Sequence, residues 1–166
     1  MLGLVGVAVP ARAADTPTAT PLAGELSISA PGSVDLGSVP IGASQQSAHL
    51  GTVTVADTRG AVGASWTATV SSTDFTTGSG SLNETIARAS ISYWSGLATA
   101  STGVVTRIPG QLLAANAVTL ATSRTAFSAI LTVGNNTTSW NPTVIVTVPS
   151  SAVAGVYTAT LTHSVA

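Results

Sequence analysis

Apolar residues alternate with Ser and Thr along most of this chain, and turn-forming Gly, Pro, Asn and Asp separate the alternating stretches. Such alternation is typical of antiparallel strands that bury one face and expose the other. Val and Thr, which fill many of these positions, favour an extended backbone because they branch at Cβ. The clearest stretches are residues 25–29, 49–56, 65–71, 86–94, 127–133, 143–148 and 156–165. The pattern therefore predicts an all-β fold, an antiparallel β-sandwich.

The alternation weakens in residues 95–124. Within them, residues 111–116 are compatible either with a helical turn or with a long crossing loop, and we expect little or no other helix outside the N-terminal apolar segment. From residue 25 to residue 166 the composition is uniform, with no second linker and no block of charge. We therefore predict one domain that covers residues 25–166.

The N-terminal residues predict export. Residues 2–9 form an apolar run, and residues 11–13 (Ala-Arg-Ala) follow with the small-x-small form that a signal peptidase needs. The run is far shorter than the roughly 20 apolar residues of a membrane-spanning helix, so we predict a secretory signal peptide over residues 1–13 and no transmembrane segment. No Lys or Arg precedes the run, which indicates a translation start further upstream. The Thr/Pro-rich residues 14–24 are predicted to form a flexible linker.

Composition and charge argue against several classes of protein function. The chain has no Cys, which excludes a disulfide scaffold and a Cys-ligated metal site. Its basic residues are five Arg and its net charge is −1, so it cannot neutralise many phosphates and nucleic-acid binding is not expected. The two His have no paired carboxylate nearby, and six acidic residues are too few for a multi-carboxylate calcium site. We predict no bound metal and no cofactor.

Catalysis is not expected either. Ser is abundant, but no Gly-x-Ser-x-Gly motif places one at a nucleophile turn. A Ser-His-Asp triad would have to use His49 or His163, and His163 shares a strand face with apolar residues. The few carboxylates do not stand in a setting typical of glycosidases. We therefore predict that the protein is not an enzyme.

Alternation also assigns each aromatic residue to a strand face, because residues two apart point the same way. Trp66 shares its face with Ala68 and Val70 and is predicted to be a core residue. Trp94 differs, since its neighbours at the same spacing are an Arg and two Ser. An exposed indole beside Ser and Thr suits carbohydrate, because the CH face of a sugar can lie on the ring while its hydroxyls form hydrogen bonds at the rim. The alternative is that residues 95–124 fold over Trp94 and bury it.

Tyr93, Trp140 and Arg59 are further candidate ligand contacts. Tyr93 precedes Trp94, and Trp140 lines up with the apolar residues of the next strand unless the intervening proline breaks the register. Arg59 could hold a carboxylate, and the alternative is a turn in which Asp57 accepts a hydrogen bond and forms a local ion pair with Arg59. The predicted ligand contacts are therefore Trp94, Tyr93, Arg59 and Trp140.

Three segments together match a known sequence pattern. Residues 53–60 (Val-Thr-Val-Ala-Asp-Thr-Arg-Gly) lead into residues 63–70 (Gly-Ala-Ser-Trp-Thr-Ala-Thr-Val), and residues 157–165 read Tyr-Thr-Ala-Thr-Leu-Thr-His-Ser-Val. They resemble the WxL domain family of Gram-positive surface proteins, in which an Asp-Thr-Arg-Gly-like turn precedes Trp-x-Leu and the domain closes with Tyr-x-x-x-Leu-Thr-Trp-x-Leu. The chain departs from the family with Ala68 in place of Leu in the first motif, and with His and Val in place of Trp and Leu in the second. The positions that carry the resemblance are Asp57, Arg59, Gly60, Trp66, Tyr157, Leu161, His163 and Val165.

The resemblance implies a sandwich of the immunoglobulin-like or WxL type and a protein that is secreted, extracellular or cell-wall associated. It also implies non-covalent attachment to the cell wall, with peptidoglycan or another cell-wall glycan as the partner. Because the net charge is small, such binding should change little with salt. The alternative function is a structural or interaction protein that assembles with other exported surface proteins, or with itself, by β-strand pairing, because Thr/Val strands with little charge leave few edge protections.

Overall fold

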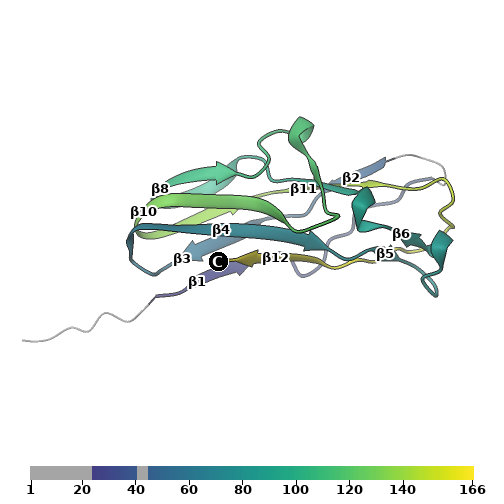
Figure 1. Cartoon of the computed structure of the whole chain (residues 1–166), viewed down its shortest axis with the longest axis horizontal. Helices are drawn as coiled ribbons and strands as arrows, with labels where there is room; N and C mark the ends of the chain where they lie inside the picture. Colours follow the sequence, from purple (N-terminus) through teal and green to yellow (C-terminus); the bar gives the residue numbers. More distant parts are fainter. Residues whose placement is uncertain (1–23, 41–44) are drawn as a thin grey trace, which may run out of the picture.

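The computed structural model of the chain describes residues 24–40 and 45–166, in which strands and short 3₁₀ turns are the regular elements (Figure 1). This confirms the all-β prediction. The strands are β1 (Leu26–Ser29), β2 (Gln45–His49), β3 (Val53–Asp57), β4 (Val62–Ser72), β5 (Phe75–Thr76), β6 (Thr85–Ile86), β7 (Ile91–Trp94), β8 (Ala98–Pro109), β9 (Val118–Thr119), β10 (Arg124–Trp140), β11 (Thr143–Thr147) and β12 (Leu161–Val165). The 3₁₀ turns are Leu82–Glu84, Arg88–Ser90 and Ala114–Asn116, the last within the predicted turn at residues 111–116. The predicted signal peptide and nearly all of the predicted linker lie outside the described residues.

The strands form two main sheets and one two-stranded sheet, β5–β6, and every pair is antiparallel. The larger sheet has the order β1-β3-β10-β4-β12. Its sixth strand, β8, lies outside this order and pairs with β10. Its end strands β1 and β12 lie next to each other, so this sheet is nearly closed. The second sheet has the order β2-β11-β7-β9.

The larger sheet turns back on itself at one end of the molecule, on the left of Figure 1. The first part of β10 pairs with β4 and its last part pairs with β3. Between these parts the backbone has a positive φ at Leu131 (55°) and Gly134 (68°), and β8 follows the bend at Gly103 (76°). A short turn, residues 58–61, joins β3 to β4 beside them. We call residues 58–61, 103 and 131–134 the folded end.

Three chain segments run from one sheet into the other. β2 continues into β3, β7 into β8 and β10 into β11, each after a short break. Pro142 interrupts the third segment, and its carbonyl oxygen accepts a hydrogen bond from the N–H of Leu50 (2.9 Å). The N–H of Gly51 donates to Oδ1 of Asn141 (3.1 Å). Because the strands are continuous across these breaks, residues from both sheets pack into one apolar core.

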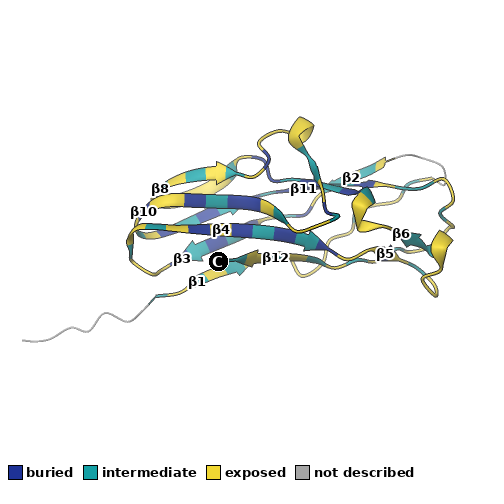
Figure 2. Ribbon diagram, in the orientation of Figure 1, coloured by how far each residue is buried: buried dark blue, intermediate teal, exposed yellow. Residues whose placement is uncertain are grey.

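Burial alternates along the strands that line the core, as Figure 2 shows for β4 and β10. Trp66, Ala68 and Val70 are buried, which confirms their predicted face. Where the pattern predicted one strand over residues 86–94, the structure has β6, a 3₁₀ turn and β7. β8 was not among the predicted strands. Most of its residues are exposed, so neither face imposes an apolar pattern on its sequence.

Candidate functional site

The outer face of the second sheet brings a Trp and several polar side chains together in cross-strand rows. On β7 the first and third residues are buried, while Ser92 and Trp94 point outward. β7 pairs with β11, and β11 pairs with β2, so Trp94, Thr143 and His49 stand in one row. Side chains directly opposite each other in antiparallel strands have Cβ atoms about 4.5–5.5 Å apart and interact. The next row holds Ser92, Ile145 and Ser47, with Thr119 beyond Ser92, and we call these residues together with the first row the Trp94 face.

Trp94 is half-buried, because one side of its indole rests on the chain that follows β7. Gly96 lies against the ring, and a Cβ at this position would stand 3.4 Å from Cζ3 of Trp94. The N–H of Gly96 donates a hydrogen bond to the carbonyl oxygen of Gln111 (3.0 Å), which ties this part of the chain to the residues after β8. The indole is thus partly covered and partly accessible. The structure therefore lies between the two alternatives, a fully exposed Trp94 and a Trp94 buried by residues 95–124.

His49 and Thr143 place hydrogen-bonding groups beside the indole. Thr143 Oγ1 and His49 Nδ1 are 3.0 Å apart, and His49 is exposed while Thr143 is buried, at 8% exposure. The Trp94 face has no acidic residue and no Arg. Its indole, hydroxyl and imidazole groups can stack on a neutral ligand and exchange hydrogen bonds with it, which suits a sugar. Sequence reasoning missed His49 and Thr143, because the pairing of β2 and β7 with β11 has no local signal.

Tyr93 and Trp140 are completely buried, so their prediction as ligand contacts is wrong. Trp140 Nε1 donates a hydrogen bond to Tyr93 Oη (3.1 Å), and the Trp140 indole stacks on Phe127 with ring centroids 5.1 Å apart. Burial raises the pKa of Tyr93 above its ordinary value, which keeps the phenol neutral. The physical reason for the correction is strand position. Tyr93 points to the face opposite Trp94, and Trp140 follows Thr138 on the core side of β10.

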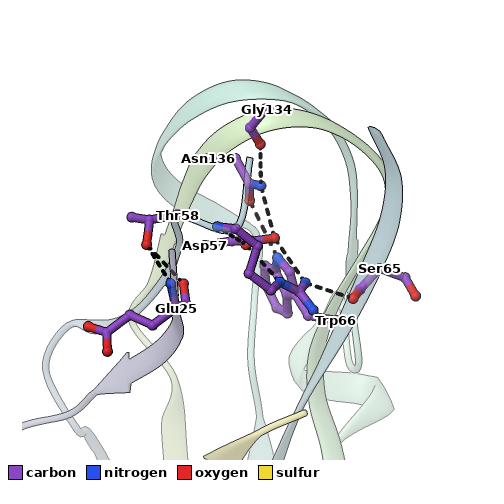
Figure 3. A network of polar contacts seen from close by, with 8 residues as sticks. Glu25, Asp57, Thr58, Ser65, Trp66, Gly134 and Asn136 are labelled. Carbon is purple, nitrogen blue, oxygen red and sulfur yellow. Dashed lines mark hydrogen bonds and ion pairs between the residues drawn. The ribbon is translucent and has the colours of Figure 1, made fainter. Parts of the chain in front are cut away.

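Arg59 belongs to a hydrogen-bond network at the folded end (Figure 3). Its Nε and Nη2 donate to the two carboxylate oxygens of Asp57 at 2.9 and 3.0 Å, and Nη2 also donates to the carbonyl oxygen of Ser65 (3.0 Å). The N–H of Arg59 donates to Asp57 Oδ1 (3.1 Å), as in an Asx turn. These contacts confirm the alternative of a local turn with an ion pair. They engage Nε and Nη2 within the chain, while the Arg59 side chain stays 33% exposed, so Arg59 as a ligand contact stays a prediction.

Asp57 is 2% exposed and anchors this network from inside the fold. Its hydrogen bonds with the Arg59 guanidinium lower the pKa of the carboxyl below its ordinary value, so the group is ionised at neutral pH. Asn136 Nδ2 donates to Asp57 Oδ2 (3.3 Å), and Trp66 Nε1 donates to Asn136 Oδ1 (3.4 Å). Gly60 takes the positive φ (67°) that the turn requires. The first motif therefore ties β3, β4 and β10 together.

The second motif lies on β12 and just before it, and its residues are half-buried. His163 Nε2 is 3.3 Å from Tyr93 Oη, and burial lowers the pKa of His163 to about 4. The Tyr157 hydroxyl lies 3.0 Å from the carbonyl oxygen of Val153. A cavity of about 960 Å³ opens between residues 30–40 and 152–161, and its wall includes many apolar side chains. The motif residues that line this cavity are Tyr157, Leu161 and His163.

The described part of the chain holds no group of three or more side chains that could bind a metal ion. None of the described residues belongs to a helix that is long and apolar enough to cross a membrane. In comparisons with known proteins, no family model, no curated protein and no solved structure matches this chain.

Proposed function

We propose that the chain is a secreted, non-catalytic binding module that attaches non-covalently to the cell wall through the Trp94 face. The observation that carries the proposal is the row Trp94–Thr143–His49, in which an accessible part of an indole stands beside a hydroxyl and an imidazole and no residue of the row is acidic, Lys or Arg. Peptidoglycan or another wall glycan offers CH faces to the indole and hydroxyls to the polar groups. Because three paired strands hold the row, little side-chain freedom is lost on binding.

The fold that we propose is a β-sandwich of the WxL type. The two motif segments that resemble this family are neighbours in the larger sheet, where Val165 of β12 stands opposite Ala68 of β4, two residues from Trp66. The turn of the first motif closes the folded end through Asp57 and Arg59. This arrangement supports the resemblance, because motif positions nearly a hundred residues apart in sequence are brought together in one sheet.

Sedimentation with purified Gram-positive sacculi tests the proposed attachment. The wild-type protein should pellet with the sacculi, and Trp94→Ala should bind about tenfold more weakly, since a well-placed aromatic contact contributes about 1–1.5 kcal/mol. Leu82→Ala is the matched control, because Leu82 is an apolar side chain that is 90% exposed on a different element. Binding should change little with salt, because the face has no charged group. Wild-type protein that stays in the supernatant at low and high salt alike rejects the proposal.

Assembly with other exported surface proteins by β-strand pairing is the second candidate function. It is favoured by β8, which among residues 24–40 and 45–166 pairs only with β10 and leaves its other edge free. A crosslinked pull-down from secreted proteins tests it. A partner should be recovered with the wild type and with Trp94→Ala and lost with Val104→Lys, because a charge on an edge strand opposes pairing. If no partner shows this dependence, the second candidate is rejected.

A further inference from the structure

β8 is the longest edge strand of the larger sheet, and one of its sides has no partner strand in the described part of the chain. It pairs with β10 from Ala98 to Pro109. On the other side, no backbone hydrogen bond joins it to a further strand within the described residues. An unpaired edge of this kind offers its N–H and C=O groups to another strand unless charge, proline or a covering segment protects it.

The one charged residue of β8 does not protect this edge. Arg107 is turned toward the bend, where Nε donates to Thr138 Oγ1 (3.0 Å) and Nη2 donates to the carbonyl oxygen of Thr102 (2.6 Å). The guanidinium thus connects β8 to β10 across the bend, and its hydrogen bonds keep it from blocking a strand that would add to the free edge. Pro109 stands only at the end of the strand. The edge therefore lacks the usual obstacles to strand addition.

Exposed apolar side chains lie along this edge and beside it. Val104 is 68% exposed and Ile108 is 43% exposed. Val104 stands opposite Val133 of β10, and Val133 stands opposite Val62 of β4, so three exposed valines form a row across three strands. Leu131, in the same bend, is also exposed and has a φ of 55°, a conformation that is costly for a residue with a Cβ. Contiguous exposed apolar surface is typical of a protein interface.

We propose that β8 pairs with β8 of a second copy of this chain, antiparallel over residues 104–108. The inference rests on the second candidate function, assembly by strand pairing, and names the partner. A two-fold axis at Thr106 places Val104 of each copy opposite Ile108 of the other, so that the exposed side chains cover one another. A second copy fits this edge because an antiparallel strand pair is itself symmetric and an uncharged edge needs no complementary charge in its partner. The larger sheets of the two copies then form one continuous sheet.

Single-cysteine crosslinking tests the proposed register, because the chain has no Cys of its own. Under mild oxidation Thr106→Cys should form a linked dimer at least about tenfold faster than a distant control, since the axis brings the two Cβ atoms to roughly 5 Å. Thr162→Cys is that control: Thr162 is an equally exposed Thr whose strand pairs with β4, away from β8. Equal rates at the two positions overturn the proposal.

Analytical ultracentrifugation tests the association itself. The wild type should show a concentration-dependent equilibrium between monomer and dimer, and Val104→Lys with Ile108→Lys should weaken it by about tenfold or more, because like charges placed near each other across two strands repel. Leu82→Lys, at a 90% exposed apolar residue on the 3₁₀ turn Leu82–Glu84 away from β8, should leave the dimer in place. Circular dichroism checks that each variant keeps its strands.

A wild type that is monomeric at every concentration overturns the proposal, and so does a dimer that the two lysines leave unchanged or that Leu82→Lys abolishes. These outcomes are distinct from failure of the proposed functions. Capture of another exported protein through β8 by a strictly monomeric chain would keep assembly by strand pairing and reject the second copy as its partner. Sedimentation with sacculi is decided separately by the Trp94 face.

Discussion

The folded end and the half of the molecule around the cavity are stabilised in different ways. At the folded end the polar contacts are mostly local: Asp57 and Arg59 are two residues apart, and Arg107 donates to a carbonyl five residues before it. Around the cavity, residues 30–40 and 150–160 contain no strand, and they are fixed by distant partners such as Thr76, which exchanges two backbone hydrogen bonds with Thr158. Local turns, tied to β10 by the hydrogen bond between Asn136 and Asp57, thus close one end of the fold, while the segments at the other end depend on long-range contacts and leave a cavity of about 960 Å³.

The difference in packing between the two halves should be largest when one buried aromatic residue in each half is replaced by Ala. Trp66 is 2% exposed among closely paired strands, so Trp66→Ala should lower the free energy of unfolding by about 3–5 kcal/mol. Phe75 lines the cavity, and Phe75→Ala should lower it by only about 2 kcal/mol, because the change enlarges a space that already exists. Urea unfolding followed by circular dichroism gives both values. Equal losses would contradict the view that the two halves differ in packing.

The second largest loss of stability should follow from a change in the polar network at the folded end. Asp57→Asn keeps the shape of the side chain and removes the charge that Arg59 and Asn136 contact, which should lower stability by about 3 kcal/mol at pH 7. The pKa of Asp57 is lower in the folded protein than in the unfolded chain. At pH values between these two pKa values, the folded wild type therefore binds fewer protons than the unfolded chain. Its advantage over Asp57→Asn should therefore be complete above the unfolded pKa and disappear as the pH falls through the lowered folded pKa.

Urea unfolding of both proteins at a series of pH values measures this advantage. Arg88→Gln is the control, since no ion pair of Arg88 occurs among the described residues. An advantage that persists unchanged down to pH 2 would show that the charge of Asp57 does not hold the folded end.

His163 provides a smaller, pH-dependent test on the cavity side. Burial lowers its folded pKa from 6.5 to about 4, so between these values the unfolded chain binds more protons than the folded one. The wild type should lose about 2 kcal/mol of stability, relative to His163→Gln, as the pH falls from 7 to 5. Tyr93, the titratable group in contact with the ring, stays neutral across this range. Parallel pH profiles of the two proteins would mean that water already reaches His163 freely from the cavity.

The sequence predicted those features that depend on neighbouring residues. Alternation placed Trp66 in the core and Trp94 on the outside, because side-chain direction along a strand is a local property. It missed β8, since an edge strand that buries neither face need not alternate. It could not supply the partners of Trp94, because the rows of the Trp94 face are created by pairing strands 50 to 100 residues apart in the chain. The bend of β10 was missed as well, because the predicted strand ended at residue 133, before the turn-forming Gly134, whereas the structure continues one bent strand to Trp140.

A substitution in the bend of β10 should give the smallest change in the free energy of unfolding. Leu131 has a positive φ and is exposed, so Leu131→Gly removes a backbone strain of about 1–2 kcal/mol and loses little burial. Glycine costs about 0.5–1 kcal/mol through its greater freedom in the unfolded chain, which leaves a net gain in stability of about 0.5–1 kcal/mol. Ile130→Gly, at the preceding exposed position without a positive φ, has no strain to relieve and should lose about 1 kcal/mol. If both variants lose the same stability, the Leu131 side chain holds the bend through its contacts, and the folded end is not closed by backbone geometry and the Asp57 network alone.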